Sequence, residues 1–213
     1  MVAPASAPPA GLDGLDPEWS ELVRVPSIDG VGRTWHILDN RVADPRLTVV
    51  CVHGNPSWSY LFRDLVRRAP EGVRVIAVDQ LEMGFSERSG RTRRLATRID
   101  DLDALTTELG LDGPVVTVAH DWGGPVSLGW AQRHVDQLAG VVLMNTAVHQ
   151  PEGSPAPSLI RLARSRPLLR NVTVNTTTFI RGAIEMSSPR LPAAVRRGFL
   201  APYGSADRRT AIG

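Results

Sequence analysis

The segment 115–124 constrains the fold of this chain more than any other part of its sequence. An apolar run, Val-Val-Thr-Val-Ala, ends abruptly in His120 and Asp121, and two glycines follow at 123 and 124. This pattern is typical of a nucleophile elbow, a sharp turn between a buried strand and a helix that raises one side chain above the end of a sheet. The raised residue is Asp121, so the sequence predicts an aspartate nucleophile where a serine is more usual.

The rest of the chain supplies the sheet that such an elbow needs. Two short strands near 21–28 and 33–39 predict an antiparallel hairpin at the start of the fold. Apolar runs predict buried strands at 47–52, 73–78, 115–119 and 138–145, and helical spacing predicts helices at 57–68, 93–109 and 124–134. This alternation predicts an α/β protein with a mostly parallel sheet and helices on both faces.

Polar residues follow the predicted strands at the edge where such folds bind their ligands. Asn55, Glu82, Asp121 and Asn145 all stand there. Any one of them has an ordinary structural explanation, such as a tight turn or a helix N-cap. Their joint position at the carboxyl ends of the strands is what predicts a functional site.

The chain divides by composition into three parts. Residues 1–19 are rich in Pro, Ala and Gly and predict a disordered lead-in, while 20–150 predict the α/β core. Residues 151–213 contain seven prolines between short helical patterns and predict a helical cap. The charge changes at the same place. Residues 1–150 carry 14 Arg against 19 acidic residues, a net of −5, and 151–213 carry 10 Arg against 3 acidic residues, a net of +7.

The overall balance of charge and apolar residues limits the partners. A net charge of +2 gives no indication of a nucleic acid or a membrane surface as partner. The sequence has neither a signal-peptide pattern nor a run of about 18 apolar residues, so we expect a cytoplasmic protein without a membrane span. The single cysteine, Cys51, lies in an apolar strand, and no residue set predicts a metal or another cofactor.

The sequence His-Gly-Asn-Pro at 53–56 complements the elbow. The loop after this strand and the residue after the nucleophile usually supply the two N–H groups of an oxyanion hole, which here belong to Asn55 and Trp122. Their carboxamide and indole side chains add donors that could hold a leaving halide or a substrate oxygen. We expect a small hydrophobic substrate because of the apolar residues near the strand ends. The residues expected to surround it are His53, Trp58, Phe62 and Phe85.

Three motifs together resemble the α/β-hydrolase superfamily. They are His-Gly-Asn-Pro-Ser-Trp-Ser-Tyr (53–60), Asp-Gln-Leu-Glu-Met-Gly-Phe-Ser (79–86) and His-Asp-Trp-Gly-Gly (120–124). More narrowly, they resemble the haloalkane dehalogenases and the β-lactone decarboxylases of bacterial long-chain olefin synthesis. The resemblance implies that Asp121 is the nucleophile and that Asn55 and Trp122 stabilise the halide or the substrate.

The motif at 79–88 and the Pro-rich tract after Asn145 resemble the decarboxylases most, so a β-lactone converted to an alkene is the expected substrate. A haloalkane dehalogenase is the first alternative. An epoxide hydrolase is the second alternative and ranks lower. Epoxide hydrolases usually carry an aromatic residue where this chain has Asn55, and they use tyrosines of the cap, where this chain has only Tyr203. A relative that binds a ligand without catalysis is an alternative of a different class.

Some residues depart from the family pattern. Glu82 stands where a glycine is usual, and we expect it to place a charge near the mouth of the site and to strain its loop. The family also uses an acid and a histidine late in the chain, whereas no histidine follows His149. We expect His120 to point away from the nucleophile. His149 is then the one residue that could substitute for the missing catalytic histidine.

The missing acid and histidine lead to an expectation about the whole protein. We expect a fragment that lacks the final strands and the catalytic histidine, and that forms the front of a longer polypeptide, fused to or in complex with other enzymes of its pathway. Such a chain would form a covalent intermediate but stall before turnover.

Overall fold

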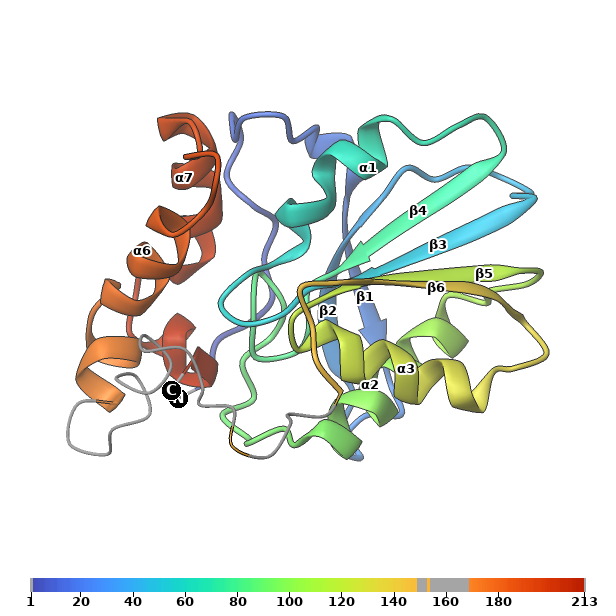
Figure 1. The fold of residues 1–213 in the computed structure, drawn as a ribbon. Helices are drawn as coiled ribbons and strands as arrows, with labels where there is room; N and C mark the ends of the chain where they lie inside the picture. The colour runs from blue at the N-terminus through green and yellow to red at the C-terminus, as the bar shows by residue number, and fades with distance from the viewer. Residues whose placement is uncertain (1, 149–152, 154–168, 213) are drawn as a thin grey trace.

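The computed structural model describes residues 2–148, 153 and 169–212, and it contains a six-stranded sheet (Figure 1). The order of the strands across the sheet is β1-β2-β4-β3-β5-β6. The strands are β1 (Ser20–Val25), β2 (Arg33–Asp39), β3 (Leu47–Val52), β4 (Val73–Val78), β5 (Val115–His120) and β6 (Leu138–Met144).

The sheet is mixed but mostly parallel, as the sequence predicts. β1 pairs with β2 in antiparallel register, and β2 pairs in the same way with β4. The strands β4, β3, β5 and β6 are parallel, with Val50 opposite both Ile76 and Thr117. The predicted opening hairpin and the α/β fold class are both confirmed.

Helices cover both faces of the sheet (Figure 1). The short helix α1 (Arg63–Arg67) lies on one face, and α2 (Leu95–Glu108) and α3 (Gly123–Arg133) lie together on the other. The helix predicted at 57–68 begins later, as the 3-10 turn η2 (Ser59–Phe62) that leads into α1. The backbone N–H of Ser59 donates to Asp79 Oδ1 at 2.7 Å, which fixes the start of this turn.

The alternation of side chains along the central strands explains why these strands are apolar throughout. In β3, Val49 and Cys51 belong to the cluster under α1, whereas Val50 and Val52 belong to the cluster under α2 and α3. Successive residues of a strand point to opposite faces, so a strand with both faces covered needs apolar residues at every position.

The N-terminal segment differs from the disordered lead-in predicted for 1–19. Ala3 and Arg88 exchange backbone hydrogen bonds, and Ser6 N donates to Phe85 O at 3.0 Å. Leu12 packs against the cluster that joins the core to the cap helices. Composition alone predicts disorder, but these backbone hydrogen bonds and the partly buried side chains of Leu12, Leu15 and Trp19 hold this segment against the fold.

The helices after 168 stand beyond the carboxyl ends of the parallel strands (Figure 1). The elements there are η3 (Asn171–Asn175), α6 (Thr178–Glu185), α7 (Ala193–Leu200), η4 (Ala201–Tyr203) and η5 (Asp207–Ile212), and η1 (Pro17–Trp19) lies near the N-terminus. We refer to 169–212 as the cap segment. The boundary expected near 150 lies outside the described residues, so this division of the chain stays a prediction.

An aromatic cluster joins the cap segment to the sheet. Trp58 and Tyr60 stack with ring centroids 5.2 Å apart, and the indole N–H of Trp58 donates to Gly198 O at 3.1 Å. A Cβ atom on Gly198 would meet the Tyr60 ring at 2.4 Å, so α7 lies directly against that ring. Ile180 and Val195 complete the contact from the cap side.

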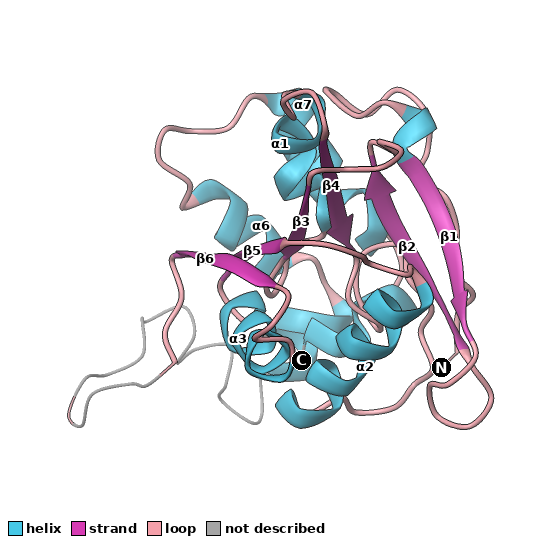
Figure 2. Cartoon of the chain, turned by 90° about the vertical axis from the view of Figure 1, so that its right-hand side faces the viewer, coloured by secondary structure: helices cyan, strands magenta, loops and turns pink. Residues whose placement is uncertain are grey.

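The strand β6 forms the edge of the sheet opposite β1 (Figure 2). Its apolar residues Val142 and Leu143 are 45% and 43% exposed.

Among the helices that the structure describes, none is long and apolar enough to cross a membrane.

Candidate active site

Asp121 occupies a sharp turn between β5 and α3. Its φ of +53° lies in the left-handed region, which non-glycine residues rarely adopt. Thr146 Oγ1 donates to the Asp121 carbonyl at 2.6 Å, and Gly124 N donates to the same oxygen at 2.9 Å. Such a conformation costs of order 1–3 kcal/mol and persists only where the surroundings fix it. Asp121 therefore has the backbone geometry of a nucleophile elbow.

The close approach of three chain segments explains the glycines around Asp121. A Cβ atom on Gly123 would lie 2.0 Å from Val52 O, and one on Gly54 would lie 2.2 Å from Asp121 Oδ1. On Gly124 it would lie 2.2 Å from the hydroxyl oxygen of Thr146. None of these positions can hold a side chain unless a neighbour moves.

The Asp121 carboxylate is held by the loop after β3. The backbone N–H of Asn55 donates to Asp121 Oδ1 at 2.9 Å, and Asn55 precedes a cis peptide bond to Pro56. The other carboxylate oxygen, Oδ2, makes no hydrogen bond to a described residue. A hydrogen bond from a backbone N–H to a carboxylate is charge-assisted and directional. It orients the carboxylate and leaves Oδ2 free to attack a bound molecule.

A cavity of about 260 Å³ opens over this carboxylate. Its polar end contains Asn55, Ser57, His120 and Asp121, and the cap segment contributes Ser187. The remaining wall is largely apolar, and its residues are Pro56, Leu61, Ala183, Ile184, Leu191 and Phe199.

Asp121 and Asn55 are the predicted site residues that the structure brings together here. Trp122 is 57% exposed and does not line the cavity. Its place after the nucleophile follows from the sequence, but the direction of its ring does not. Among the described residues, the structure therefore does not bring Trp122 to the cavity that Asn55 and Asp121 line.

The residues expected to surround the substrate are core residues instead. Trp58, Phe62 and Phe85 are at most 6% exposed, and none of them lines the cavity. Trp58 and Phe85 pack edge to face at 5.0 Å beneath the cap segment, and Phe62 lies in the cluster under α1. Their position in the sequence near the strand ends suggested a pocket, but their rings turn into the packed interior.

His53 is also buried and does not line the cavity. Its Nδ1 lies 2.8 Å from Gly54 O, and Gln80 N donates to its Nε2 at 3.0 Å. These contacts place the proton on Nδ1 and leave Nε2 as the acceptor. Burial lowers the pKa of His53, which the nearby Asp79 carboxylate partly opposes. His53 is therefore a neutral residue that fixes two loops rather than a group that contacts a substrate.

Asp79 connects the loops behind the site, a role that the sequence did not reveal. Its carboxylate accepts hydrogen bonds from the backbone N–H groups of Ser59 and Phe85, both at 2.7 Å, and from His36 Nδ1 at 2.8 Å. Burial raises the pKa of Asp79, but the charge and hydrogen bond of His36 outweigh this effect, and the pKa falls below its usual value. A Cβ atom on Gly84 would lie 2.2 Å from this carboxylate.

Glu82 does not place a charge at the mouth of the site, contrary to the expectation. It is 3% exposed, and its carboxylate accepts hydrogen bonds from Ser89 and from Gly90 N. Arg93 Nε lies 3.7 Å from the same group. The expected strain is present, because Glu82 has a φ of +73°. The carboxylate turns toward its own loop, where donors are available.

His120 lines the cavity beside Asp121, although strand alternation predicted that it would point away. Sequence reasoning also missed the cap residues of the wall. Ala183, Ile184 and Ser187 are spaced as one helical face, and that spacing was the available signal.

His149 lies outside the described residues. Among the residues that are described, no group of three or more His, Cys, Asp or Glu could hold a metal ion.

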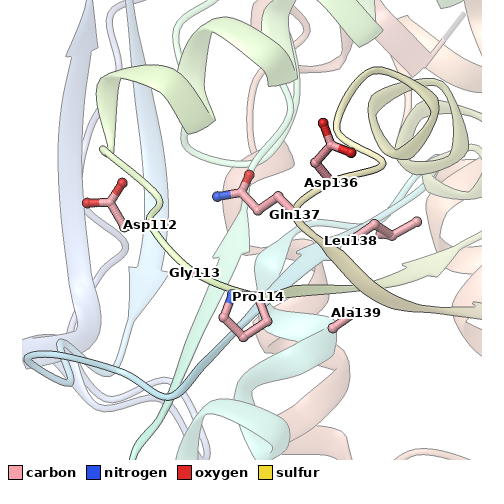
Figure 3. A pocket seen from close by; sticks show the side chains of 7 residues that line it. All are labelled: Asp112, Gly113, Pro114, Asp136, Gln137, Leu138 and Ala139. Atoms are coloured by element: carbon pink, nitrogen blue, oxygen red, sulfur yellow. The ribbon is translucent and has the colours of Figure 1, made fainter.

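A second hollow lies at the opposite end of the strands. It has a volume of about 510 Å³ and is formed by the turns that precede β5 and β6 (Figure 3). Its lining residues are Asp112, Gly113, Pro114, Asp136, Gln137, Leu138 and Ala139. Its volume exceeds that of the Asp121 cavity, but it lies away from the carboxyl ends of the strands and contains no strained or specially oriented nucleophile.

Comparison with known proteins agrees with this geometry. A family profile described as alpha/beta hydrolase fold matches residues 48–193. A cis-3-alkyl-4-alkyloxetan-2-one decarboxylase of Xanthomonas campestris pv. campestris is 39% identical over 171 residues, which cover 76% of this chain and 57% of that protein. Haloalkane dehalogenase 2 of Mycobacterium tuberculosis is 36% identical over 112 residues, covering 52% of this chain and 38% of that protein.

A solved structure has the same fold. The haloalkane dehalogenase DatA from Agrobacterium tumefaciens superposes with a TM-score of 0.74 at 23% identity, covering 91% of this chain and 66% of that chain. The chain therefore belongs to the α/β-hydrolase family. It is haloalkane dehalogenase-like and related to the β-lactone decarboxylases, and it spans a little more than half the length of the decarboxylase that it matches.

Proposed function

We propose that this chain carries the nucleophile of an enzyme that opens a hydrophobic β-lactone and converts it to an alkene. The observation that carries the proposal is the position of Asp121. Its strained backbone presents a carboxylate, oriented by the N–H of Asn55, to the polar end of a mainly apolar cavity. The decarboxylase from Xanthomonas, at 39% identity, supports a lactone over other electrophiles.

The proposed chemistry begins with Asp121 Oδ2. It forms a bond to C4, the saturated ring carbon that carries the ring oxygen, and the C4–O bond breaks with its electron pair on that oxygen. The product is an Asp121 ester that bears a free carboxylate. Loss of CO₂ then gives the C=C electron pair, and cleavage of the ester C–O bond restores the Asp121 carboxylate. All atoms of the lactone end in CO₂ and the alkene, and Asp121 returns to its starting state.

Intact-mass spectrometry of the 213-residue chain tests this proposal. We expect exposure to a short-chain cis-3,4-dialkyl β-lactone to add the whole lactone mass, because ring opening expels no atom, or to release alkene. The expected change is absent in Asp121→Asn and present in Asp112→Asn, an exposed carboxylate beside the other hollow. If the unchanged chain formed neither the adduct nor the alkene, that result would contradict the proposal.

The haloalkane dehalogenases among the relatives make dehalogenation the second candidate. A bromoalkane of matched size, tested in parallel, would add its mass less HBr, because the carboxylate displaces bromide. An adduct from the bromoalkane alone would assign this second function. Ligand binding with neither reaction would indicate a relative that binds without catalysis.

A further inference from the structure

The elbow brings His120 to the same side as the nucleophile. Along β5, Val115, Thr117 and Ala119 are buried, and the residues between them are less buried. Regular alternation would place His120 and Asp121 on opposite faces. The left-handed backbone of Asp121 breaks that alternation, and both residues line the cavity.

The surroundings of the His120 ring define which nitrogen carries the proton. Nδ1 is buried and has no hydrogen-bond partner among the described residues. A buried N–H without an acceptor is costly, so the proton belongs on Nε2. Burial also lowers the pKa of His120, and the Asp121 carboxylate only partly opposes this shift. At neutral pH the ring is therefore uncharged and carries one N–H donor, on Nε2.

This arrangement supplies a need of the proposed reaction. Attack by Asp121 places a negative charge on the lactone oxygen, and a donor fixed near that oxygen stabilises the transition state more than the ground state. The indole of Trp122 does not line the cavity, and most of the rest of the wall is apolar. Asn55, Ser57 and His120 are the polar residues beside the nucleophile at this end, and the Ser57 hydroxyl donates to Trp58 O at 3.4 Å.

We propose that His120 is a substrate-contacting residue, whose Nε2–H donates a hydrogen bond to the lactone oxygen that becomes charged when Asp121 attacks. This inference rests on the proposed function. No proton is transferred, because the lactone oxygen ends in a carboxylate that stays attached to the Asp121 ester. The buried Nδ1 lone pair also means that His120 does not activate water, so it assists the attack and not a later hydrolysis.

The first test compares two variants of His120 in the rate of adduct formation with the β-lactone. His120→Phe keeps a planar ring but removes the donor, and we expect adduct formation to slow by about 10- to 100-fold. His120→Gln keeps an N–H group, and we expect it to recover most of the rate. Equal rates for His120→Phe and the unchanged chain would overturn the inference. A similar loss in both variants would do the same, because it would indicate a structural role.

A second test does not depend on the reaction. γ-Hexalactone is an unstrained, neutral lactone of eight heavy atoms, which fits a cavity of about 260 Å³. In NMR titrations we expect it to shift the Nε2 resonance of His120 and to bind about fivefold more weakly to His120→Phe. Failure to shift that resonance would refute the contact. If the unchanged chain forms neither adduct nor alkene, the proposed function fails, and this titration still decides whether His120 contacts a lactone.

Discussion

The two walls of the Asp121 cavity are built in different ways. The polar wall consists of β5, the elbow and the loop after β3, where backbone atoms approach so closely that Gly54 and Gly123 have no room for a side chain. The cap wall consists of apolar side chains such as Ile184, Leu191 and Phe199, which reach the cavity from helices and the turns between them. Backbone geometry fixes the first wall, and side-chain packing fixes the second.

This difference separates what each wall contributes. A wall made of close backbone contacts holds the nucleophile and its donors in one arrangement, as a reacting group requires. A wall of packed apolar side chains tolerates changes of shape at modest cost. We therefore expect changes in the polar wall to affect the chemistry strongly, and changes in the cap wall to affect the choice of substrate.

The largest effect is expected for Gly54→Ala. The new methyl group would lie 2.2 Å from Asp121 Oδ1 and must displace the carboxylate, so adduct formation should slow by about 100-fold or more. Gly204→Ala is the matched control in the cap segment, because its Cβ has no atom within 4 Å. Intact-mass kinetics measure both. A normal rate for Gly54→Ala would show that the carboxylate can move freely, which contradicts a fixed polar wall.

The next effect concerns the support behind the polar wall. Asp79→Asn removes a buried charge that is paired with His36, and we expect the free energy of unfolding in urea to fall by roughly 3 kcal/mol. Asp64→Asn, at an exposed carboxylate on α1, should change it by less than about 1 kcal/mol. Equal effects would mean that Asp79 does not organise the loops.

A smaller effect follows from the lowered pKa of His53. The unfolded chain protonates this histidine near its ordinary pKa of about 6.5, whereas the folded chain keeps it neutral to lower pH. Proton uptake then favours the unfolded state, so His53 makes stability fall as the pH drops below about 6.5. The slope is at most about 1.4 kcal/mol per pH unit. Urea unfolding at pH 7.5 and 5.5 should show a smaller decrease for His53→Gln, and parallel decreases would refute the assignment.

The smallest effect is expected in the cap wall. Leu191→Ala enlarges the cavity without touching the polar end, so the adduct rate with a short-chain lactone should change by less than about fivefold. The rate with a longer-chain lactone should rise relative to the short one. A 100-fold loss with both substrates would remove the distinction between the two walls.

Local sequence patterns were sufficient for the strands, the elbow and the position of Asn55. Each of these depends on neighbours within a few residues, on runs of apolar residues, or on glycines at tight turns. Trp58, Phe62 and Phe85 were placed in the pocket because they follow strand ends, yet packing against the cap segment and α1 turns them inward. No local pattern determines such long-range contacts.

The predicted direction of the His120 side chain was wrong for a different reason. Strand alternation is a reliable rule only while the backbone stays extended, and it stops at the left-handed residue that follows. The same limit applies to Glu82, whose positive φ and nearby donors turn its carboxylate into its own loop. Residues at or next to a strained backbone position are therefore the ones for which side-chain direction has to be observed.

The central claim is that Asp121 is the nucleophile, and the most direct measurement is tandem mass spectrometry of the lactone-treated chain after cleavage at arginine. Asp121 then lies in the peptide 99–133, which has no internal arginine. We predict that the added lactone mass maps to Asp121 and to no other carboxylate of that peptide. Modification of a different residue, with Asp121 unmodified, would contradict the account.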